Sequence, residues 1–483
     1  MQRANQLNLL DDPIITAKEN DWTFNGASTR ELTHCYHDYP ARMIPQVAAK
    51  LIDLYGGNAK NLFDPYCGSG TSLVEGMLRG LDVIGTDLNP LARIIAEAET
   101  TIPDLFALEN SIKQYNDFVL RSQPIKLEKS PIIQGITNID FWFKPQVIEK
   151  LLRLKVFIDT IDDDAVRLFF KVAFSETIRE SSNTRNDEFK LYRYDPIKLK
   201  LFDPHVFYIM SSKLKRNRLG LEKYIKSMCK YKNFPDAKIC GFNTVEGIPE
   251  KLFSKNSVDL VVTSPPYGDS HTTVAYGQYS RLSAAWLGLE EPEKIDRKLM
   301  GGQIIKKMPV FPSEELNKII NQIAQKDHKR AMEVASFYSE LQQSISNVAK
   351  VIKPGGYACY VVGNRKVKGN VLPTDVTIRD FFSSVGYEYI VTHQRCIPNK
   401  RMPLRNSPTN ATGVLDDTMT REYIVVMRRK LNYMVAERLS IYSPSSKKKN
   451  SKLKTISHGS KTVKTVLEKK KTIYKSIKST KQK

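Results

Sequence analysis

Hydrophobic positions in this chain fall into short apolar runs separated by longer stretches of helical period. The apolar runs predict strands, because strands are short and rich in β-branched and aromatic residues. Seven strands are predicted, at residues 60–66, 81–87, 237–243, 257–263, 356–363, 387–396 and 421–428. Strands that alternate with helices indicate an α/β fold with a doubly wound, mostly parallel sheet. The last two runs have no helical pattern between them and predict an antiparallel edge.

The second and third predicted strands are separated by far more residues than one crossover helix requires. Helical period is found within this stretch at residues 105–121, 144–161, 164–180 and 205–231. We therefore predict an inserted helical subdomain at residues 105–235. It divides the sheet domain into a first part, residues 1–104, and a second part, residues 236–430.

A glycine-rich turn follows the first predicted strand, which ends at Asp64-Pro65. The turn reads Tyr66-Cys67-Gly68-Ser69-Gly70-Thr71, and a helical segment begins directly after it. Glycines let a ligand approach closely, and a helix start directs backbone N–H groups toward it. The second strand ends at Asp87-Leu88, where a carboxylate can accept hydrogen bonds from ribose hydroxyls. No Gly-Lys-Ser/Thr follows the turn, which excludes a P-loop.

The fourth predicted strand ends at Ser264-Pro265-Pro266-Tyr267. Two consecutive prolines cannot donate to a sheet, so the strand must stop and form a rigid corner. The Ser264 hydroxyl and the Pro265 carbonyl could accept hydrogen bonds from the exocyclic amine of a planar ring, with Tyr267 stacked on the ring face. The alternative for Tyr267 is a tyrosine packed beneath the strand end. Both motifs follow strands of one sheet, so we expect them to share a single crevice.

These motifs, together with the segment Thr33 to Arg42, resemble the amino-methylating DNA methyltransferases that use S-adenosylmethionine. The resemblance extends from about residue 30 to residue 430. It implies the class I methyltransferase fold, with a doubly wound, mostly parallel seven-stranded sheet. In that family Ser-Pro-Pro-Tyr is typical of enzymes that methylate N4 of cytosine, whereas Asp or Asn in the first position is typical of N6-adenine enzymes.

The resemblance also implies roles for individual residues. The glycine turn corresponds to the motif that holds the methionine part of the cofactor, and Asp87 to the one that holds the ribose. Asn243 stands where the family often has an Asp near the adenine. The implied cofactor-binding residues are Tyr39, Pro40, Asp64, Pro65, Cys67, Gly68, Gly70, Thr71, Asp87, Leu88 and Asn243. The implied catalytic residues are Ser264, Pro265, Pro266 and Tyr267.

This chemistry requires few reactive groups, because the sulfonium methyl is already activated and the amine needs only to be positioned. Methylation of cytosine C5 would instead require a thiolate, which that family carries on a Pro-Cys dipeptide. None of the six cysteines follows a proline, which disfavours the C5 reaction. A base in a duplex must be extruded first, at a cost of roughly a few kcal/mol.

The formal charge of +22 is unevenly distributed. Residues 444–483 contain 14 Lys and one acid, Glu468, so this tail carries +13 and the rest of the chain +9. Its composition predicts a disordered tail that contacts phosphates without base specificity. A solubilising extension without a partner is the alternative.

Several regions are candidates for DNA contact, among them residues 289–327, which interrupt the sheet after the diproline corner. Residues 198–232 hold ten Lys or Arg against two acids, and a polar run ends at Arg185-Asn186. The loop at residues 399–412 connects the last two strands. The inserted region 105–235 is the first choice for target recognition, and this loop is the second. The candidate DNA-binding residues are Arg185, Asn186, Lys213, Lys215, Arg216, Arg218, Lys400, Arg401 and Arg405.

The composition and spacing of residues disfavour several classes of protein. No run approaches the ~18 apolar residues of a membrane helix. The first 20 residues do not resemble a signal peptide, the cysteines have neither zinc nor disulfide spacing, and His34 and His37 lack companion metal ligands. We therefore expect no metal and no membrane partner, and a location in the cytoplasm of a bacterium or archaeon, at the nucleoid.

Taken together, these patterns predict a site-specific methyltransferase acting on N4 of a flipped-out cytosine in double-stranded DNA, in a restriction-modification system with a cognate endonuclease. Alternatives are an N6-adenine DNA methyltransferase, a tRNA guanine-N2 methyltransferase, and a non-catalytic nucleic-acid-binding protein on the same scaffold.

Overall fold

The computed structural model describes residues 21–121, 123–186, 188–268, 274–397 and 419–431, and the backbone of residues 405–406 and 416–417. The basic tail at residues 444–483, Lys400 and Arg401 lie outside the described residues, as does most of the 399–412 loop.

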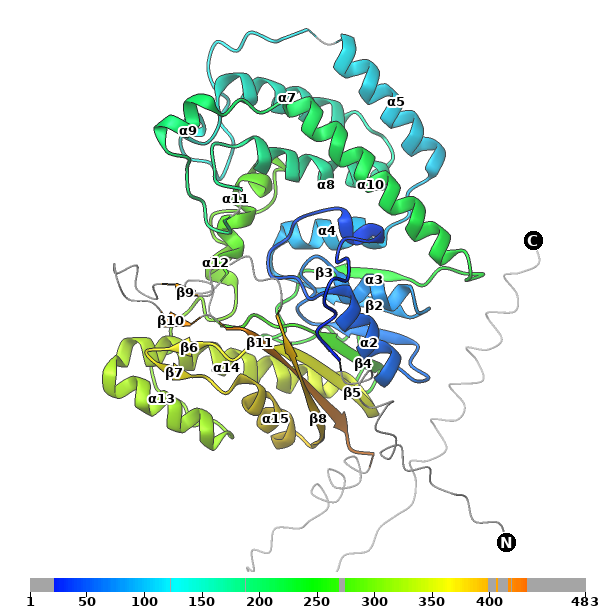
Figure 1. Ribbon diagram of the computed structural model, residues 1–483. Coiled ribbons are helices and arrows are strands. Elements are labelled where there is room, and N and C mark those ends of the chain that lie inside the picture. The colour runs from blue at the N-terminus through cyan, green and yellow to red at the C-terminus, as the bar shows by residue number, and fades with distance from the viewer. Residues whose placement is uncertain are drawn as a thin grey trace, which may run out of the picture. The chain divides into compact units, whose positions relative to one another are not determined.

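A seven-stranded sheet forms the centre of the fold, with the strand order β3-β2-β1-β4-β5-β11-β8 (Figure 1). The strands are β1 (Asn61–Asp64), β2 (Asp82–Thr86), β3 (Ala237–Cys240), β4 (Val258–Thr263), β5 (Ile352–Val362), β8 (Tyr387–Cys396) and β11 (Arg421–Arg429). The first five pair in parallel, and β11 is antiparallel to both β5 and β8. The predicted α/β fold with seven strands and an antiparallel edge is confirmed.

The central strands are apolar because both faces of the sheet are covered. Neighbouring residues of a strand point to opposite faces, so Leu62 belongs to one core and Phe63 to the other. The first core packs against α2 (Pro45–Tyr55) and α3 (Thr71–Met77). The second core packs against α13 (Glu314–Lys326), α14 (His328–Val351) and α15 (Thr374–Ser384). This is the doubly wound arrangement that the alternating pattern predicts.

Six helices occupy the stretch between α4 (Pro90–Thr100) and β3. They are α5 (Leu105–Arg121), α6 (Ile139–Trp142), α7 (Pro145–Asp159), α8 (Asp164–Ser181), α9 (Pro196–Leu201) and α10 (Val206–Met228). Figure 1 shows them as a layer beyond α4, on the side away from α13–α15. With α4 and α11 (Tyr276–Trp286) they enclose a third core, which includes Phe169, Phe170 and Phe174.

Shorter elements complete the described chain. They are η1 (Leu32–Cys35), α12 (Ile295–Lys298), and the two-residue strands β6 (Lys366–Val367), β7 (Asn370–Val371), β9 (Arg405–Asn406) and β10 (Asp416–Asp417). None of the helices in the described ranges is both long and apolar enough to cross a membrane.

Candidate active site

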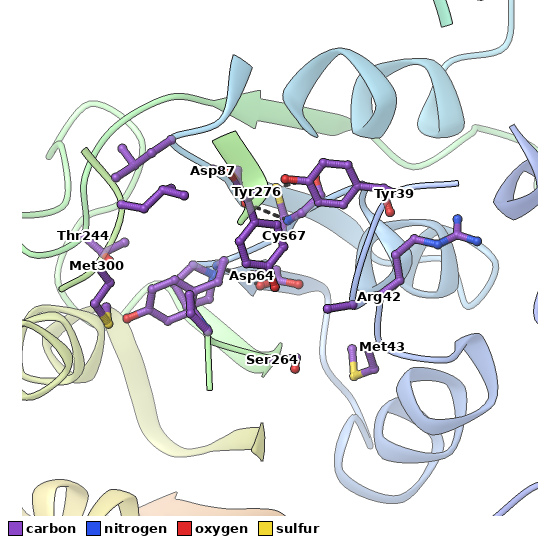
Figure 2. A pocket seen from close by; sticks show the side chains of 18 of the residues that line it. Tyr39, Arg42, Met43, Asp64, Cys67, Asp87, Thr244, Ser264, Tyr276 and Met300 are labelled. Atoms are coloured by element: carbon purple, nitrogen blue, oxygen red, sulfur yellow. Dashed lines mark hydrogen bonds between the residues drawn. The ribbon is translucent and has the colours of Figure 1, made fainter. Parts of the chain in front are cut away.

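A cavity lies at the carboxyl ends of β1, β2 and β4. The strand order reverses between β1 and β4, and open α/β sheets bind ligands at such a switch point. Gly68 lines this cavity, and so do Ser264 and Pro266. Figure 2 shows Tyr39, Asp64, Asp87, Ser264 and Tyr276 around it. The expectation that the glycine turn and the diproline corner share one crevice is confirmed.

Most of the residues expected to bind the cofactor lie in the wall of this cavity. They are Tyr39, Pro40, Asp64, Pro65, Cys67, Gly68, Thr71, Asp87, Leu88 and Asn243. Gly70 is not among the described lining residues. It has a φ of 92°, and a Cβ atom there would lie 3.0 Å from the Cβ of Ala96. Gly70 therefore serves the close packing of the turn against α4.

Asp64 is buried at the end of β1, where three donors meet its carboxylate. Oδ1 accepts from the Thr263 hydroxyl (2.5 Å) and from the Tyr66 backbone N–H (3.0 Å), and Oδ2 accepts from the Ser72 hydroxyl. Burial raises the pKa of Asp64 to about 6, although these hydrogen bonds oppose the shift. Asp64 thus holds the glycine turn and the end of β4 together.

Asp87 ties the glycine turn to β2. Its Oδ2 accepts from the Gly68 N–H (3.0 Å), and its Oδ1 accepts from the Asn89 N–H (2.8 Å). Burial raises the pKa of Asp87 as well. Each carboxylate oxygen keeps a free lone pair, so Asp87 can still accept a hydrogen bond from a ligand hydroxyl.

Residues 33–43, named here the N-terminal strap, close one side of the cavity. Tyr39 stacks on Tyr276 with ring centroids 5.9 Å apart, and its hydroxyl accepts from Asn89 Nδ2 (2.9 Å). Burial raises the pKa of Tyr39, which keeps it a neutral phenol. Arg42 and Met43 line the same wall.

The strap histidines are buried and bonded within the protein. His34 Nε2 lies 2.9 Å from Glu75 Oε1, and His37 Nε2 lies 2.9 Å from the Ser175 hydroxyl. Burial lowers the pKa of His37 to about 3. Within the described ranges, no three His, Cys, Asp or Glu side chains are grouped so that they could hold a metal ion. Both histidines therefore anchor the strap to the helices behind it.

Only some residues of the corner after β4 line the cavity. Ser264 and Pro266 line the cavity, whereas Pro265 is buried and Tyr267 is not among the described lining residues. The Ser264 hydroxyl donates to the Val361 carbonyl (3.1 Å), and the Tyr267 hydroxyl donates to Glu422 Oε1 (2.9 Å). Tyr267 is half-buried, and its stacking on the face of a base stays a prediction.

Other lining residues were not assigned to the site individually, although Ala41, Arg42, Tyr66 and Ser69 lie within the motif segments. These other lining residues are Ala41, Arg42, Met43, Tyr66, Ser69, Ser72, Phe242, Thr244, Val245, Gly268, Tyr276, Lys298, Leu299, Met300 and Glu340. Most of these residues lie within two positions of a residue that was assigned from a motif, so a slightly longer motif would have included them. Tyr276, the Lys298–Met300 segment and Glu340 adjoin no motif. Glu340 Oε2 accepts from the Gly301 N–H (2.8 Å), and burial raises its pKa.

Several candidate DNA-binding cations are neutralised by nearby carboxylates. Arg216 lies 2.5 Å from Glu176 Oε2, and Lys213 pairs with Glu176 and Glu180. Arg218 pairs with Glu109. The basic run at residues 198–232 is therefore less positive than its composition indicates, whereas Lys215 is exposed.

The polar run that ends at residue 186 is mostly structural. Ser181, Ser182, Asn183 and Thr184 are buried, and Asn186 Nδ2 donates to the Glu180 carbonyl (3.3 Å). Arg185 is exposed and pairs with Glu188 (3.1 Å). For Arg405 the structure gives only the backbone, in β9.

Comparison with known proteins places the chain in a family. No protein-family model matches it. The type II methyltransferase M.MvaI of Kocuria varians is 41% identical over 427 residues, which cover 85% of this chain and 94% of that protein. The type II methyltransferase M.BsoBI of Geobacillus stearothermophilus is 22% identical over 454 residues, covering 79% of this chain and 85% of that one.

Solved structures align only weakly. An rRNA methyltransferase from Streptomyces viridochromogenes, aviRa, covers 81% of this chain and 88% of its own with 12% identity and a TM-score of 0.29, which is too low to support an argument. The match to M.MvaI, in contrast, extends over most of this chain and nearly all of that protein. It shows that this chain belongs to the type II methyltransferases, a family of S-adenosylmethionine-dependent DNA methyltransferases.

Proposed function

We propose that this protein transfers a methyl group from S-adenosylmethionine to the exocyclic N4 amine of a cytosine that is flipped out of double-stranded DNA. The observation that carries the proposal is the position of Ser264, whose hydroxyl lines the same cavity as the glycine turn. A serine at this corner is the form typical of N4-cytosine enzymes in the family that the chain resembles. The type II names of its relatives support a site-specific reaction on DNA in a restriction-modification system.

The hydrogen bonds of Ser264 support an acceptor role. Its hydrogen is directed to the Val361 carbonyl (3.1 Å) or the Tyr267 oxygen (3.3 Å), both inside the protein. The oxygen lone pairs therefore remain for a donor in the cavity, and an exocyclic amine is such a donor. Fixed acceptors can hold an amine so that its lone pair points at a methyl group.

The cysteine in the cavity wall does not support C5 methylation. Burial raises the pKa of the Cys67 thiol well above its ordinary value, which disfavours the thiolate that C5 chemistry requires. Its sulfur also faces the Gly68 carbonyl at 3.8 Å. An amine target therefore fits this cavity better than a ring carbon.

The cavity suits S-adenosylmethionine in the chemistry of its wall, which offers carboxylates and the backbone of a glycine turn. We propose that Asp64 and the Gly68 to Thr71 turn hold the methionine part, that Asp87 accepts from the ribose hydroxyls, and that Asn243 lies near the adenine. At Gly68, with a φ of 51°, an added Cβ would have Tyr39 as its nearest neighbour at 3.8 Å, so the turn leaves space for a ligand. When bound, the cofactor supplies a methyl group activated by its sulfonium.

We propose that target recognition lies in the helices of residues 105–235, at the loop 183–194. The loop is closed by backbone hydrogen bonds from Arg185 N–H to the Tyr192 carbonyl (2.8 Å) and from Tyr194 N–H to the Asn183 carbonyl (2.9 Å). Arg185 and Tyr192 are exposed on it. A cation beside an aromatic ring suits nucleic acid, where phosphates and unstacked bases are contacted together.

The attachment of this loop to α11, the helix that carries Tyr276, supports the proposal. Arg179 of α8 donates to the Glu188 carbonyl in the loop and to the Tyr279 carbonyl of α11 (3.3 Å). Its guanidinium also lies 3.9 Å from the centroid of the Tyr279 ring. Tyr276, at the start of α11, lines the cavity. We therefore propose Arg185, Tyr192 and Lys215 as DNA contacts, and Lys213 and Arg216 as part of the scaffold.

The test is identification of the methylated nucleoside. The full chain would be incubated with methyl-labelled cofactor and with double-stranded DNA or tRNA, and the nucleosides separated by chromatography and mass spectrometry. We expect N4-methylcytosine from DNA alone. N6-methyladenine would overturn the choice of base, and label only in tRNA would overturn the choice of DNA. Modification-sensitive sequencing of host DNA would then give the recognised site.

A further inference from the structure

Four side chains beneath the cavity form a continuous chain of hydrogen bonds. Arg395 Nη1 donates to Glu422 Oε2 (2.9 Å), and Glu422 Oε1 accepts from the Tyr267 hydroxyl (2.9 Å). The Tyr267 oxygen lies 3.3 Å from the Ser264 hydroxyl, which can donate to it. The chain connects the antiparallel edge of the sheet with the corner after β4.

The sheet topology explains why these residues meet. Glu422 and Arg395 are direct partners in the antiparallel register of β11 and β8, where opposite charges stabilise a pair of strands. Gly363, directly after β5, leaves the space through which Tyr267 reaches Glu422. A Cβ atom at Gly363 would lie 2.9 Å from Cδ2 of Tyr267 and 2.0 Å from the sulfur of Met419.

Burial determines which atoms carry hydrogens. The side chains of Arg395 and Glu422 are 5% and 16% exposed, so their ion pair is partly shielded from solvent. Burial raises the pKa of Tyr267 well above its ordinary value, so this residue remains a phenol that donates. Since its one hydrogen goes to Glu422, only its oxygen lone pairs can face Ser264.

We propose that Glu422 is a positioning residue for methyl transfer, because it fixes the direction of the hydrogen-bond chain that ends at Ser264. The carboxylate draws the Tyr267 hydrogen, so the tyrosine does not donate to Ser264. The Ser264 hydrogen goes to the Val361 carbonyl (3.1 Å) or to the Tyr267 oxygen (3.3 Å), and the serine thus presents its oxygen lone pairs to the cavity. Without Glu422, the tyrosine can donate to the Ser264 oxygen and occupy a lone pair that would otherwise accept from the substrate amine. The inference rests on the proposed amine methylation.

The test compares Glu422→Gln and Tyr267→Phe in the full-length protein, with single-turnover methyl transfer and cofactor affinity as readouts. We expect each variant to lower the rate of transfer by about tenfold or more, as expected when a preorganised contact at the reacting group is removed. The cofactor Kd and the KM for DNA should stay within about twofold of wild type, because neither Glu422 nor Tyr267 lines the cavity. Tyr267→Phe retains the ring and gives an independent result if Glu422→Gln does not fold.

A double-variant comparison separates positioning from general stability. If Glu422 acts through Ser264, Glu422→Gln adds nothing to the defect of Ser264→Ala, because the group it orients is absent. A penalty of equal size in both backgrounds would overturn the proposal, and so would transfer within twofold of wild type in Glu422→Gln or Tyr267→Phe.

A matched control removes a second carboxylate from the same two strands. Glu388 faces Arg428 across β8 and β11 at 3.9 Å, far along the strands from the corner, and Glu388→Gln should leave transfer unchanged.

The expected effect of Glu422→Gln on the rate of transfer does not depend on which base is methylated. Adenine as the product would overturn the proposed function while leaving the role of Glu422 intact, whereas N4-methylcytosine with an unaffected Glu422→Gln variant would overturn this inference alone.

Discussion

At the scale of single residues, two carboxyl groups govern the expected pH response of the cavity, the buried Asp64 and the half-buried Asp87. Asp64 and Asp87 lie at the ends of adjacent parallel strands, and burial raises the pKa of both. Each is also bonded to the backbone of the glycine turn or its neighbours. A ligand that brings a positive charge into this cavity therefore favours the ionised form of carboxyl groups that otherwise resist ionisation.

Cofactor affinity should increase with pH because of Asp64. Its pKa of about 6 means that the carboxyl is mainly neutral below pH 6 and ionised above it. In the proposed binding mode Asp64 helps to hold the methionine part of the positively charged cofactor, and only its ionised form attracts that charge. The affinity should therefore fall by up to about tenfold per pH unit below pH 6. Isothermal titration calorimetry between pH 5 and pH 8 would measure this.

Two variants serve as controls for that titration. Asp64→Asn should bind weakly at pH 8 with a much smaller pH dependence, and any remaining slope would come from Asp87. Asp53→Asn, at an exposed carboxylate paired with Arg79, should behave like wild type. A constant affinity of the wild-type protein from pH 5 to pH 7 would contradict the role given to Asp64.

Replacement of Ser264 should separate chemistry from binding. Ser264→Ala removes the acceptor and leaves the glycine turn unchanged, so the rate of methyl transfer should fall by about 10²-fold or more. The affinity for the cofactor should change little. Rapid-quench measurement of transfer, alongside equilibrium binding, checks both quantities, and equal losses in the two would contradict the assigned role.

At the scale of elements, Glu176 joins α8 to the N-terminal strap and to α10. It accepts from the Asp38 N–H (2.8 Å) and pairs with Arg216 and Lys213. Burial alone would raise the pKa of Glu176, but His37, Arg216 and Lys213 outweigh it and lower the pKa below its ordinary value. The stability that this carboxylate contributes is therefore present above its unfolded-state pKa and is lost as the pH falls through the lower folded-state pKa.

Loss of the Glu176 charge should destabilise the protein. Glu176→Gln leaves two cations without their buried partner, and the expected loss is about 3–5 kcal/mol in the free energy of unfolding. Glu188→Gln, which removes only the exposed partner of Arg185, should cost less than about 1 kcal/mol. Urea unfolding at pH 7 distinguishes the two variants. Similar unfolding midpoints would show that the ion pairs of Glu176 with Lys213 and Arg216 contribute little to stability.

The close packing of the glycine turn against α4 predicts that replacing Gly70 destabilises the protein. Gly70 and Gly57 both have positive φ, but only at Gly70 would a Cβ meet a neighbour, the Ala96 Cβ at 3.0 Å. Gly57→Ala should cost about 1–2 kcal/mol through backbone strain alone. Gly70→Ala should cost about 1–3 kcal/mol more through overpacking. Equal unfolding free energies for the two variants would show that α4 can move away from the turn.

At the scale of the whole molecule, charge determines how the protein meets DNA. The segment at residues 444–483 carries +13 of the formal +22, and several cations of residues 198–232 are paired internally. Removal of residues 444–483 should make DNA affinity less dependent on salt, with the logarithmic slope smaller by about 0.9 for each phosphate that the segment neutralises. The methylated site should stay the same. Filter binding over a salt series checks the slope, and an unchanged slope would favour the solubilising extension.

The elements were predictable from sequence because their signals are local. Apolar runs marked all seven strands, and the two motifs marked the carboxyl ends of β1 and β4. The distant parts of the cavity wall were not predictable, because Tyr276 and Glu340 reach it only through tertiary packing. The ion pairs of Lys213 and Arg216 were missed for the same reason, since nothing in the composition of α10 indicates that acids of α8 face it. The Tyr267 hydroxyl likewise depends on a strand that lies 155 residues further along the chain.

The order in which the cavity wall appears along the chain has a consequence for biosynthesis. The strap, the glycine turn and Asp87 leave the ribosome early, whereas Tyr276, Met300 and Glu340 follow some two hundred residues later. A nascent N-terminal half therefore carries only part of the cavity wall. Since a ligand that binds only the folded state stabilises it by mass action, capture of the cofactor would selectively protect finished molecules from proteolysis.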